Sequence, residues 1–547
     1  MNPQRRHFLK AGLAVAGCFA LGRDFWKRAY AAPATIGPSP YGPLLAADAN
    51  GLLLPQGFSS RRLATAYQPL IKADGSLTSF LWHRASDGGG VIPQADGGWI
   101  YVNNSEIPIV SDECADDLQS PFCGEQGGCS AIRFDKDGQV LDAYPILQGT
   151  NNNCAGGVTP WGTWLSCEEN FGGFVYECDP TGLTQPIRLA AMGQFNHEAA
   201  AVDPIGKRIY LTEDAPDSAF YRFTPAVWPD DGAPSLTVGT LEVAVVGANP
   251  PVRVPFGNDI ADGLSNVPGF DPDHLPIPLG LVETEPGAVR WMLVPNPLGL
   301  PVNCRDQVPT AAVFNGSEGV WYDDGMVFFT CKGSNRVWGY DTVAATIDII
   351  YDAATLGPDA PLTGVDNLVV HADSHDLFVA EDGGNMELVI ITDDTREVAP
   401  FLRYPIPHSE IAGPAFDPSG TRLYFASQGK RHTLDEATGR IIFGEIFEIS
   451  GPFRGTALAP MPGPSPAPSP TPGDTPSPAP AAPPATAAAG RFGGGGMGLG
   501  LGALTAAALL KKALAASAPP PVAAVADVAA LPPTASPTAA APEVPPA

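Results

Sequence analysis

The chain has 547 residues, more than one small domain needs, and 44% of them are hydrophobic, which is enough for a large buried core. Its formal net charge is −27. A field of this sign repels phosphodiester backbones, which argues against nucleic-acid binding. An acidic chain of this kind could be a soluble exported protein, could concentrate cations, or could do both.

The N-terminal segment, residues 1–31, resembles a twin-arginine export signal, because Arg5 and Arg6 precede a short apolar stretch. Such signals carry proteins that cross the membrane already folded. A basic start of a cytosolic protein is the alternative. "VAGC", which ends at Cys18, resembles a lipoprotein cleavage box, whereas "AYA" at 29–31 offers a competing cleavage site. We expect export to the periplasm or cell surface, with membrane attachment through Cys18 left open.

The nine cysteines fit a moderately oxidised compartment rather than a disulfide scaffold. Cys114, Cys123 and Cys129 lie together in one polar insertion, and no CxxC pair indicates a zinc site. Disulfides within the insertion are compatible with this spacing, but the pairing cannot be read from the sequence.

Six stretches of the chain share one pattern: a polar residue, a small apolar run, a turn, and a strand with an aromatic residue near its centre. Their leading residues are Asp87, Cys154, Glu198, Glu318, Asp366 and Glu410. These starts lie 67, 44, 120, 48 and 44 residues apart. A spacing of about 40 to 50 residues is typical of four-stranded propeller blades. The two longer intervals contain the cysteine insertion and a Pro/Gly-rich excursion over 226–305. We therefore predict an all-β chain with a six-bladed β-propeller over 40–455.

The remaining C-terminal part has a different composition. Residues 456–489 form a Pro/Ala/Ser-rich linker, which cannot bury a core. Residues 490–547 are a low-complexity tail, and we expect the whole Pro/Ala-rich region to be disordered. The apolar stretch within 490–512 is shorter than the about 20 residues that a membrane span needs. It could be a weak helix of an exported tail or a sorting signal that attaches the protein to a membrane.

In a propeller, the first strand of each blade lines the central channel, so the six leading residues should converge at one mouth of it. The second strands return to that mouth and are predicted to end at Glu106, Glu169, Glu213, Lys332, Glu381 and Gln428. Closely spaced carboxylates raise one another's pKa and need protons or cations to neutralise them. Ca²⁺ prefers oxygen ligands, whereas the thiolate of Cys154 suits a transition metal such as iron. A buried inert thiol or a disulfide partner is the alternative for Cys154.

The motifs around these residues resemble the PhoX-type alkaline phosphatase family of exported six-bladed propellers. The resemblance rests on "NCAGGVTPWGTWLSCEEN", "NHEAAAVDP", "RIYLTED", "EGVWYDDGMVFFTCKGSNRVWGYD", "GVDNLVV" and "EIAGPAFDPSGTRLYFASQ", and covers most of 45–450. It implies hydrolysis of phosphate esters at a cluster of iron (Fe³⁺) and calcium ions, with Cys154 as the thiolate ligand of iron. The same resemblance gives the other expected metal ligands, Glu169, Glu198, Glu318, Asp366, Glu381 and Glu410, to which the pattern of strand ends adds Glu213.

The sequence departs from the family at one position. The better-studied phosphatases place an arginine just before the glutamate matched by Glu318, whereas this chain has "FNGSEG". Lys332 and Arg336 are expected to orient the phosphate ester instead. His197, beside Glu198, is expected to protonate the leaving oxygen or to donate a hydrogen bond rather than to bind metal. The chain thus resembles a shorter, divergent branch of the family.

The predicted reaction is metal-dependent hydrolysis of a small phosphate monoester by a monomer, in which cations neutralise the phosphoryl oxygens and activate water. Two alternatives stay open. One is a calcium-dependent propeller lactonase or esterase, which would need a histidine in the channel and a metal-free Cys154. The other is a metal-stabilised binding propeller on the cell surface, without enzymatic activity.

Overall fold

The computed structural model describes residues 33–109, 125–253, 282–406, 409–429, 434–435, 440–441 and 444–456. The chain divides into two units, Met1–Met461 and Pro462–Ala547, and all described residues lie in the first. The predicted signal segment with Cys18, the insertion cysteines Cys114 and Cys123, and nearly all of the linker and tail lie outside the described residues. Among those that are described, no helix is long and apolar enough to cross a membrane.

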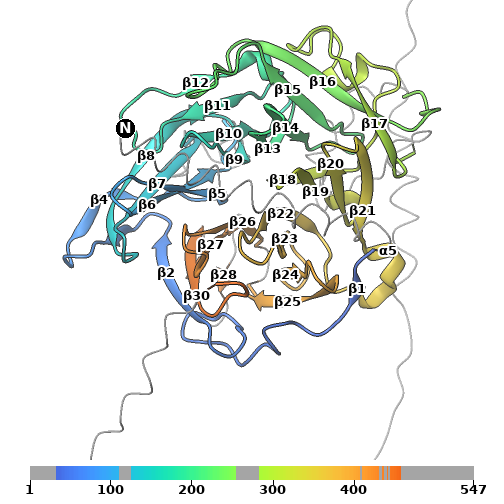
Figure 1. The fold of residues 1–547 in the computed structure, drawn as a ribbon. Coiled ribbons are helices and arrows are strands. Elements are labelled where there is room, and N and C mark those ends of the chain that lie inside the picture. Colours follow the sequence, from blue (N-terminus) through green and yellow to red (C-terminus); the bar gives the residue numbers. More distant parts are fainter. Residues whose placement is uncertain are drawn as a thin grey trace, which may run out of the picture. The chain divides into compact units, whose positions relative to one another are not determined.

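Strands form nearly all of the regular structure (Figure 1). The first two four-stranded sheets contain β5 (Ser86–Pro93), β6 (Trp99–Ser105), β7 (Gly127–Phe134) and β8 (Val140–Thr150), and then β9 (Asn153–Val158), β10 (Trp164–Glu168), β11 (Val175–Cys178) and β12 (Ile187–Arg188). A nine-stranded sheet contains β13 (His197–Asp203), β14 (Arg208–Glu213), β15 (Tyr221–Pro225), β16 (Gly239–Val246), β17 (Gly287–Leu293), β21 (Thr346–Asp352), β20 (Arg336–Asp341), β19 (Met326–Cys331) and β18 (Ser317–Asp323).

Two further sheets complete the ring. One contains β1 (Thr35–Ile36), β25 (Glu397–Arg403), β24 (Glu387–Ile391), β23 (Leu377–Glu381) and β22 (Val365–Val370), and the other contains β2 (Ser59–Thr65), β30 (Glu445–Ser450), β27 (Arg422–Ser427) and β26 (Ile411–Phe416). The short hairpins are β3 (Pro69–Ile71) with β4 (Leu77–Leu81), and β28 (Leu434–Asp435) with β29 (Arg440–Ile441). The helical turns are η1 (Ala190–Met192), η3 (Cys304–Asp306), η4 (Lys332–Ser334), α5 (Ala353–Leu356) and η5 (Gly357–Asp359).

The six predicted repeats correspond to six antiparallel hairpins that begin with β5, β9, β13, β18, β22 and β26. These inner strands contact one another in that order, and β26 contacts β5, so they close a ring around the axis (Figure 1). The all-β propeller arrangement is therefore confirmed. The number of blades stays a prediction, because β17 pairs with β21 and joins two of the hairpin units into one nine-stranded sheet.

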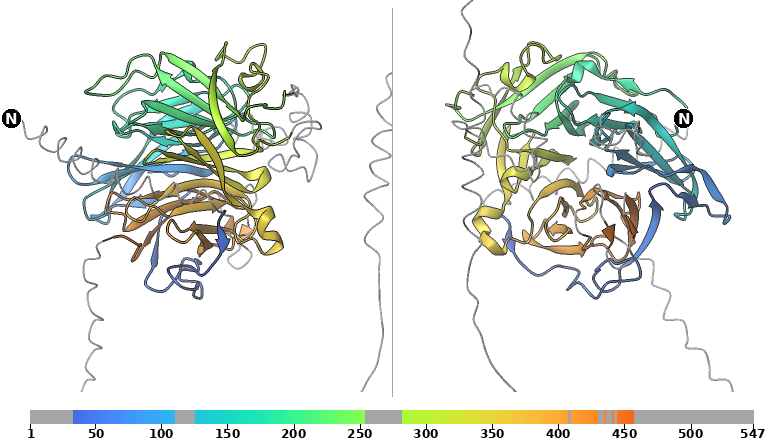
Figure 2. Two further views of the ribbon diagram at one scale, coloured as in Figure 1. Left: turned by 45° about the vertical axis from the view of Figure 1, so that its right-hand side comes forward. Right: turned by 180° about the vertical axis from the view of Figure 1, so that it is seen from behind.

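The N-terminal strand closes the ring. β2 pairs with β30 over Ser59–Thr65, so a strand from the start of the domain is the outer strand of its last sheet. In Figure 2 the blue N-terminal strand lies beside the orange strands in the view from behind. Arg61 Nη2 adds an ion pair of 2.7 Å to Glu448 Oε2 across this junction.

Small residues allow the inner strands to approach closely. Gly88 in β5 faces the next strand, and a Cβ atom there would lie 2.8 Å from Ala155 Cβ. A Cβ atom at Gly319 would likewise lie 2.7 Å from Asn367 Cα. Contacts this short are not tolerated without movement of the backbone, so the ring could not be this narrow with larger residues at these positions.

A buried ionic network lies behind the end of β14. Arg305 Nη1 lies 2.7 Å from Glu213 Oε1, and Arg305 Nε lies 3.0 Å from Asp217 Oδ1. Arg253 Nη2 lies 3.0 Å from Asp217 Oδ2. All four side chains are at least nine-tenths buried. The network therefore ties residues of the Pro/Gly-rich excursion to the end of an inner hairpin.

We predict that Gly88→Ala destabilises the propeller by about 1–3 kcal/mol, because the added methyl group overpacks the contact with β9. Gly287→Ala in β17 is the matched control, since a Cβ atom there meets Val246 Cγ1 at an ordinary 3.4 Å. Urea unfolding in the presence of a chelator measures both free energies. Equal values for the two variants would contradict the proposed steric constraint.

We predict that Arg305→Met lowers the free energy of unfolding by about 3–5 kcal/mol, since Glu213 and Asp217 would keep buried charge and lose a cation. Arg133→Met is the control, because its partner Asp96 is half exposed and exposed pairs contribute little. The measurement is again urea unfolding. A loss as small as that of the control would show that the network does not stabilise the fold.

Candidate metal centre

Five of the six predicted leading residues occupy the same place in their strands. Each is the second residue of an inner strand, and in chain order they are Asp87, Cys154, Glu198, Glu318 and Asp366. Glu410 directly precedes β26 rather than lying in it. Because the inner strands close a ring, equivalent positions in them meet at one mouth of the channel.

The residues that directly follow the second strands reach the same mouth. They are Glu106, Glu169, Asp214, Lys332, Asp382 and Gln428. All six line a cavity of about 340 Å³ together with Asp87, Cys154, Glu318, Asp366 and Glu410. Arg84 and Asn152 also contribute to its wall. The predicted convergence is thus observed, with carboxylates as the predominant side chains.

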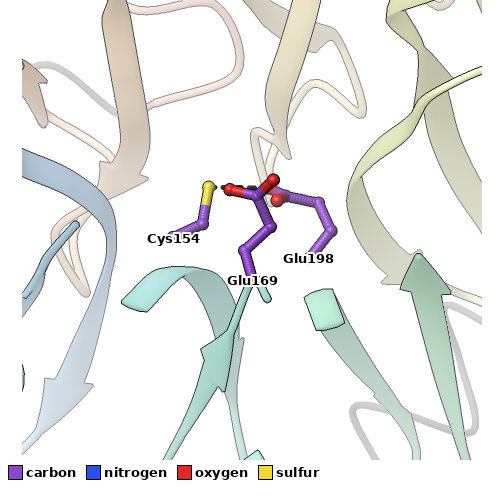
Figure 3. Close-up of side chains that lie close together, drawn as sticks. All are labelled: Cys154, Glu169 and Glu198. Atoms are coloured by element: carbon purple, nitrogen blue, oxygen red, sulfur yellow. Dashed lines mark hydrogen bonds between the residues drawn. The ribbon is translucent and has the colours of Figure 1, made fainter. Parts of the chain in front are cut away.

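Cys154, Glu169 and Glu198 form the most compact part of the cluster. Their side chains come from β9, from the residue after β10 and from β13, and they point toward one another (Figure 3). Cys154 Sγ donates a hydrogen bond of 3.2 Å to Glu198 Oε1. One ligand atom from each of the three residues lies within 4.8 Å of the others.

Two all-oxygen groups adjoin this thiol group. One combines Asp87, Glu106 and Glu410, and the other combines Glu198, Glu318 and Asp366, with the same mutual limit of 4.8 Å. Glu198 belongs to two of the three groups. Glu198 would therefore be a ligand of whichever of these two groups holds a cation.

Burial and mutual repulsion both raise the pKa values of the acidic groups in this cluster. Burial, with the charges of Glu106, Asp366 and Glu198, raises the pKa of Asp87 well above its usual range. Burial and the neighbouring carboxylates Asp87 and Glu198 raise the pKa of the Cys154 thiol. Without further positive charge, burial and repulsion favour the protonated forms of these groups.

The donor set fits bound cations. Asp87 Oδ1 and Glu198 Oε2 are buried and have no hydrogen-bond partner among the residues that the structure describes, an arrangement that is costly unless something else binds the oxygen. Groups of carboxylates suit hard cations such as Ca²⁺, and the thiol group suits a softer transition metal. The residues present therefore fit a metal centre.

Glu213 and Glu381, both predicted as metal ligands, are not among the residues that line the cavity. Glu213 accepts hydrogen bonds from Arg305 Nη1 and from Tyr221 Oη, at 2.7 and 2.8 Å. Glu381 accepts from the backbone N–H groups of Thr363 and Glu387, at 2.9 and 3.0 Å, and burial raises its pKa to about 8.

The cause is the alternation of side chains along a strand. Glu213 and Glu381 are the last residues of their strands, where the side chain faces the neighbouring loop. The next residues, Asp214 and Asp382, turn into the cavity instead. The doubled acids "ED" in both motifs gave no indication of which carboxylate faces the axis.

His197 and Arg336 also lie away from the cavity. His197 is fully buried on the opposite side of β13 from Glu198, with its ring stacked on Phe195 and Nε2 lying 3.1 Å from Gly193 O. Burial lowers the pKa of His197 to about 3, so it stays neutral. Arg336 binds Glu283 and Asp352, at 2.7 and 2.9 Å. Neither residue is placed to contact a substrate in the cavity.

Lys332 is the one predicted substrate-orienting residue that the fold brings to the site. Its Nζ lies 3.1 Å from Glu318 Oε1 and 3.4 Å from Asp382 Oδ2. Arg84, a second cation of the cavity wall, was not predicted. The sequence "WHRASDGG" could have indicated it, because Arg84 lies only three residues before Asp87.

The six described cysteines are free thiols, and Cys129 of the insertion lies buried in β7.

Comparison with known proteins agrees with these observations. The family model "Alkaline phosphatase PhoX" matches residues 91–337. PhoX from Pseudomonas fluorescens, solved in complex with vanadate, a transition state analogue, superimposes with a TM-score of 0.54 at 17% identity. The match covers 75% of this chain and 97% of that one. At this identity the similarity concerns the fold.

Two further solved structures match less well. A luciferin-regenerating enzyme matches with a TM-score of 0.37 at 10% identity, covering 74% of this chain and 98% of its own. A structural genomics protein from Bacteroides thetaiotaomicron matches with a TM-score of 0.39 at 10% identity, covering 72% and 76%. Neither bears on the site. No curated protein matches the chain.

The family match spans the hairpins that contribute Cys154, Glu169, Glu198 and Glu318, while Asp366 and Glu410 lie beyond it. The resemblance of this chain to the PhoX family of alkaline phosphatases is therefore confirmed over residues 91–337 by the family model, and the fold of most of the propeller is similar to that of PhoX from Pseudomonas fluorescens.

Proposed function

We propose that this protein is a metal-dependent phosphatase that hydrolyses small phosphate monoesters in the acidic cavity. The observation that carries the proposal is the convergence of Cys154 with the carboxylates Glu169 and Glu198 inside the segment that matches the PhoX family. Cys154 belongs to a buried apolar cluster with Ala155 and Ala199, but its Sγ lies 3.6 Å from Asp87 Oδ2 and 3.2 Å from Glu198 Oε1.

The three groups of ligand atoms suggest which residues would hold which cation. Cys154, Glu169 and Glu198 would hold iron, because the thiolate favours a transition metal. The two all-oxygen groups, which contain Asp87, Glu106 and Glu410, and Glu198, Glu318 and Asp366, would hold calcium. Bound there, the cations would supply positive charge to the phosphoryl oxygens and lower the pKa of water.

The protein's own residues would bind and orient the ester. Lys332 Nζ carries protons that can be donated to a phosphoryl oxygen, and its contacts with Glu318 and Asp382 fix it at the cavity wall. Gln428 Nε2 donates to Asp87 Oδ2 at 2.8 Å, and Asn152 Nδ2 donates to Glu106 Oε1 at 3.0 Å. These amides would orient the carboxylates toward the cations.

A lactonase or esterase that relies on a channel histidine is less well supported, because none of the described residues that line the cavity is a histidine. We further propose that the protein acts as a monomer after export by the twin-arginine route. A lipid on Cys18 or the C-terminal tail would be its means of membrane attachment.

We predict that protein purified from its export compartment hydrolyses p-nitrophenyl phosphate and contains iron and calcium by elemental analysis. Cys154→Ala should lose iron and lower kcat/KM by at least about 100-fold, since replacing a metal-ligating residue should cost no less than losing one of its supporting hydrogen bonds. Cys167→Ala is the matched control, because Cys167 is equally buried in β10 and does not line the cavity.

Full activity in Cys154→Ala would remove the thiolate from the reaction. Absence of turnover by the metal-loaded protein on phosphate, lactone and carboxylic ester substrates would instead favour a binding propeller without enzymatic activity.

A further inference from the structure

The central channel ends in a second cavity at its other mouth. Strands β5, β9, β18 and β22 contribute to both cavities, to the acidic one near their first residues and to the second one further along. In β18, Glu318 lines the acidic cavity, whereas Val320, Trp321 and Tyr322 line the second. The second cavity has a volume of about 390 Å³. It therefore lies at the opposite end of the inner strands from the candidate metal centre.

This second cavity is an apolar cavity. All six inner strands contribute apolar side chains to its wall, among them Val91, Val158, Ala201, Val320, Val370 and Ala415. Trp321, Tyr322 and Phe416 add aromatic rings. Apart from Tyr322, the ionisable residues of its described lining are Asp373 and Asp417. Apolar surface that stays in contact with water is unfavourable, so this cavity favours an apolar occupant.

The described part of the chain ends at the rim of the apolar cavity. Gly420 and Asp373 both line this cavity. A Cβ atom at Gly420 would lie 3.3 Å from Thr456 Cγ2, and a Cβ atom at Gly455 would lie 2.8 Å from Asp373 Cβ. Thr456 is the last described residue before the Pro/Ala-rich part of the chain. Residues 457–461, which follow it directly, therefore start beside the apolar cavity.

The residues just before this end hold it in place. The ring of Phe453 packs against that of Phe416 in the cavity wall, with centroids 5.0 Å apart. Arg454 Nη2 lies 2.7 Å from Asp394 Oδ2, and Thr456 Oγ1 donates a hydrogen bond of 2.6 Å to the Phe453 carbonyl. The point at which the chain leaves the described structure is therefore fixed relative to the apolar cavity.

The sequence that follows has the pattern of a ligand for such a cavity. It reads "ALAPMP" over 457–462, with Leu458 and Met461 as its large apolar residues. Pro460 and Pro462 favour an extended polyproline II conformation of the residues before them. This helix has three residues per turn, so the side chains of Leu458 and Met461 would lie on one face. Pro-rich segments bind grooves that are lined by aromatic side chains.

We propose that residues 457–461 bind in the apolar cavity, with the side chains of Leu458 and Met461 inserted into it. The chain would thereby cover apolar wall that is otherwise in contact with water at this mouth of its own channel. These residues belong to the same compact unit as the propeller. A segment of this length spans about 17 Å when extended, and it starts at the cavity rim. The inference goes beyond the proposed function and does not depend on it.

The test measures how fast N-ethylmaleimide labels a single new thiol in the full-length protein. Leu458→Cys places this thiol in the segment and keeps Met461 as its apolar side chain. Ser469→Cys is the matched control, because Ser469 also has prolines on both sides but no large apolar residue nearby. Mass spectrometry of the labelled peptides separates the new thiol from the native cysteines.

Leu458→Cys should be labelled at least about 10-fold more slowly than Ser469→Cys, because burial of Met461 keeps the segment bound. Adding Met461→Asp to Leu458→Cys should restore the rate of the control, since a carboxylate is not tolerated in an apolar cavity.

A second measurement reports on the cavity itself. The variant that combines Leu458→Ser with Met461→Ser should leave the apolar cavity open. It should bind the neutral fluorescent probe N-phenyl-1-naphthylamine about 10-fold more tightly than the wild type, in which the segment competes with the probe.

Equal labelling rates for Leu458→Cys and Ser469→Cys would overturn the inference, and so would protection of Leu458→Cys that Met461→Asp does not reduce. If the wild type binds the probe as tightly as the variant without both apolar side chains, the cavity takes a separate apolar molecule and the inference is wrong. Neither measurement uses phosphatase activity, so a failure of the proposed function would leave both results interpretable.

Discussion

The close approach of the inner strands determines what the channel can contain. At Gly88 and Gly319 the strands come so near that even a methyl group has no room. Asp87, Cys154 and Glu318 lie one residue before Gly88, its contact Ala155 and Gly319, and the narrow ring brings these groups together at the mouth. Steric packing of apolar and backbone atoms thus sets the distances between charged groups, against their repulsion.

This repulsion must be offset for the ring to persist. Burial raises the pKa values of Asp87, Glu198 and Glu318 well above their usual range, and within the described residues Asp87 Oδ1 and Glu198 Oε2 have no hydrogen-bond partner. Protons would neutralise the acids but leave little polarity for catalysis. Cations would offset the repulsion and also create an electrophilic surface for an anionic substrate. The packing of the inner strands therefore also gathers the groups that would bind these cations.

The periodicity of the sequence was sufficient to predict the propeller and most of its channel mouth. Each leading residue could be located because an acid or thiol precedes a small apolar run at a blade-like spacing. The residues at the ends of the second strands were harder to predict. A shift of one residue exchanges Glu213 for Asp214 and Glu381 for Asp382, and two adjacent acids give no signal for the direction of either side chain.

The surroundings of His197 and Arg84 depend on contacts that no local pattern contains. His197 faces the core because its neighbour Glu198 faces the channel, and the stacking partner Phe195 and the Gly193 carbonyl complete its surroundings. Arg84, which lines the cavity, pairs with Glu125, 41 residues further along the chain. Such long-range pairs cannot be inferred from the spacing of one motif.

The pairing of β2 with β30 has a consequence for how the chain acquires its structure. Arg61 and Glu448, which meet across this junction, are 387 residues apart, so the circle cannot be joined until almost the entire domain has been synthesised. Contacts of such long range slow the search for the native state. Until the two termini meet, both outer edges have unpaired backbone groups that can bind other chains. A cell that makes this protein must therefore protect an incomplete circle throughout translation, and shortening the domain from either end would leave it permanently open.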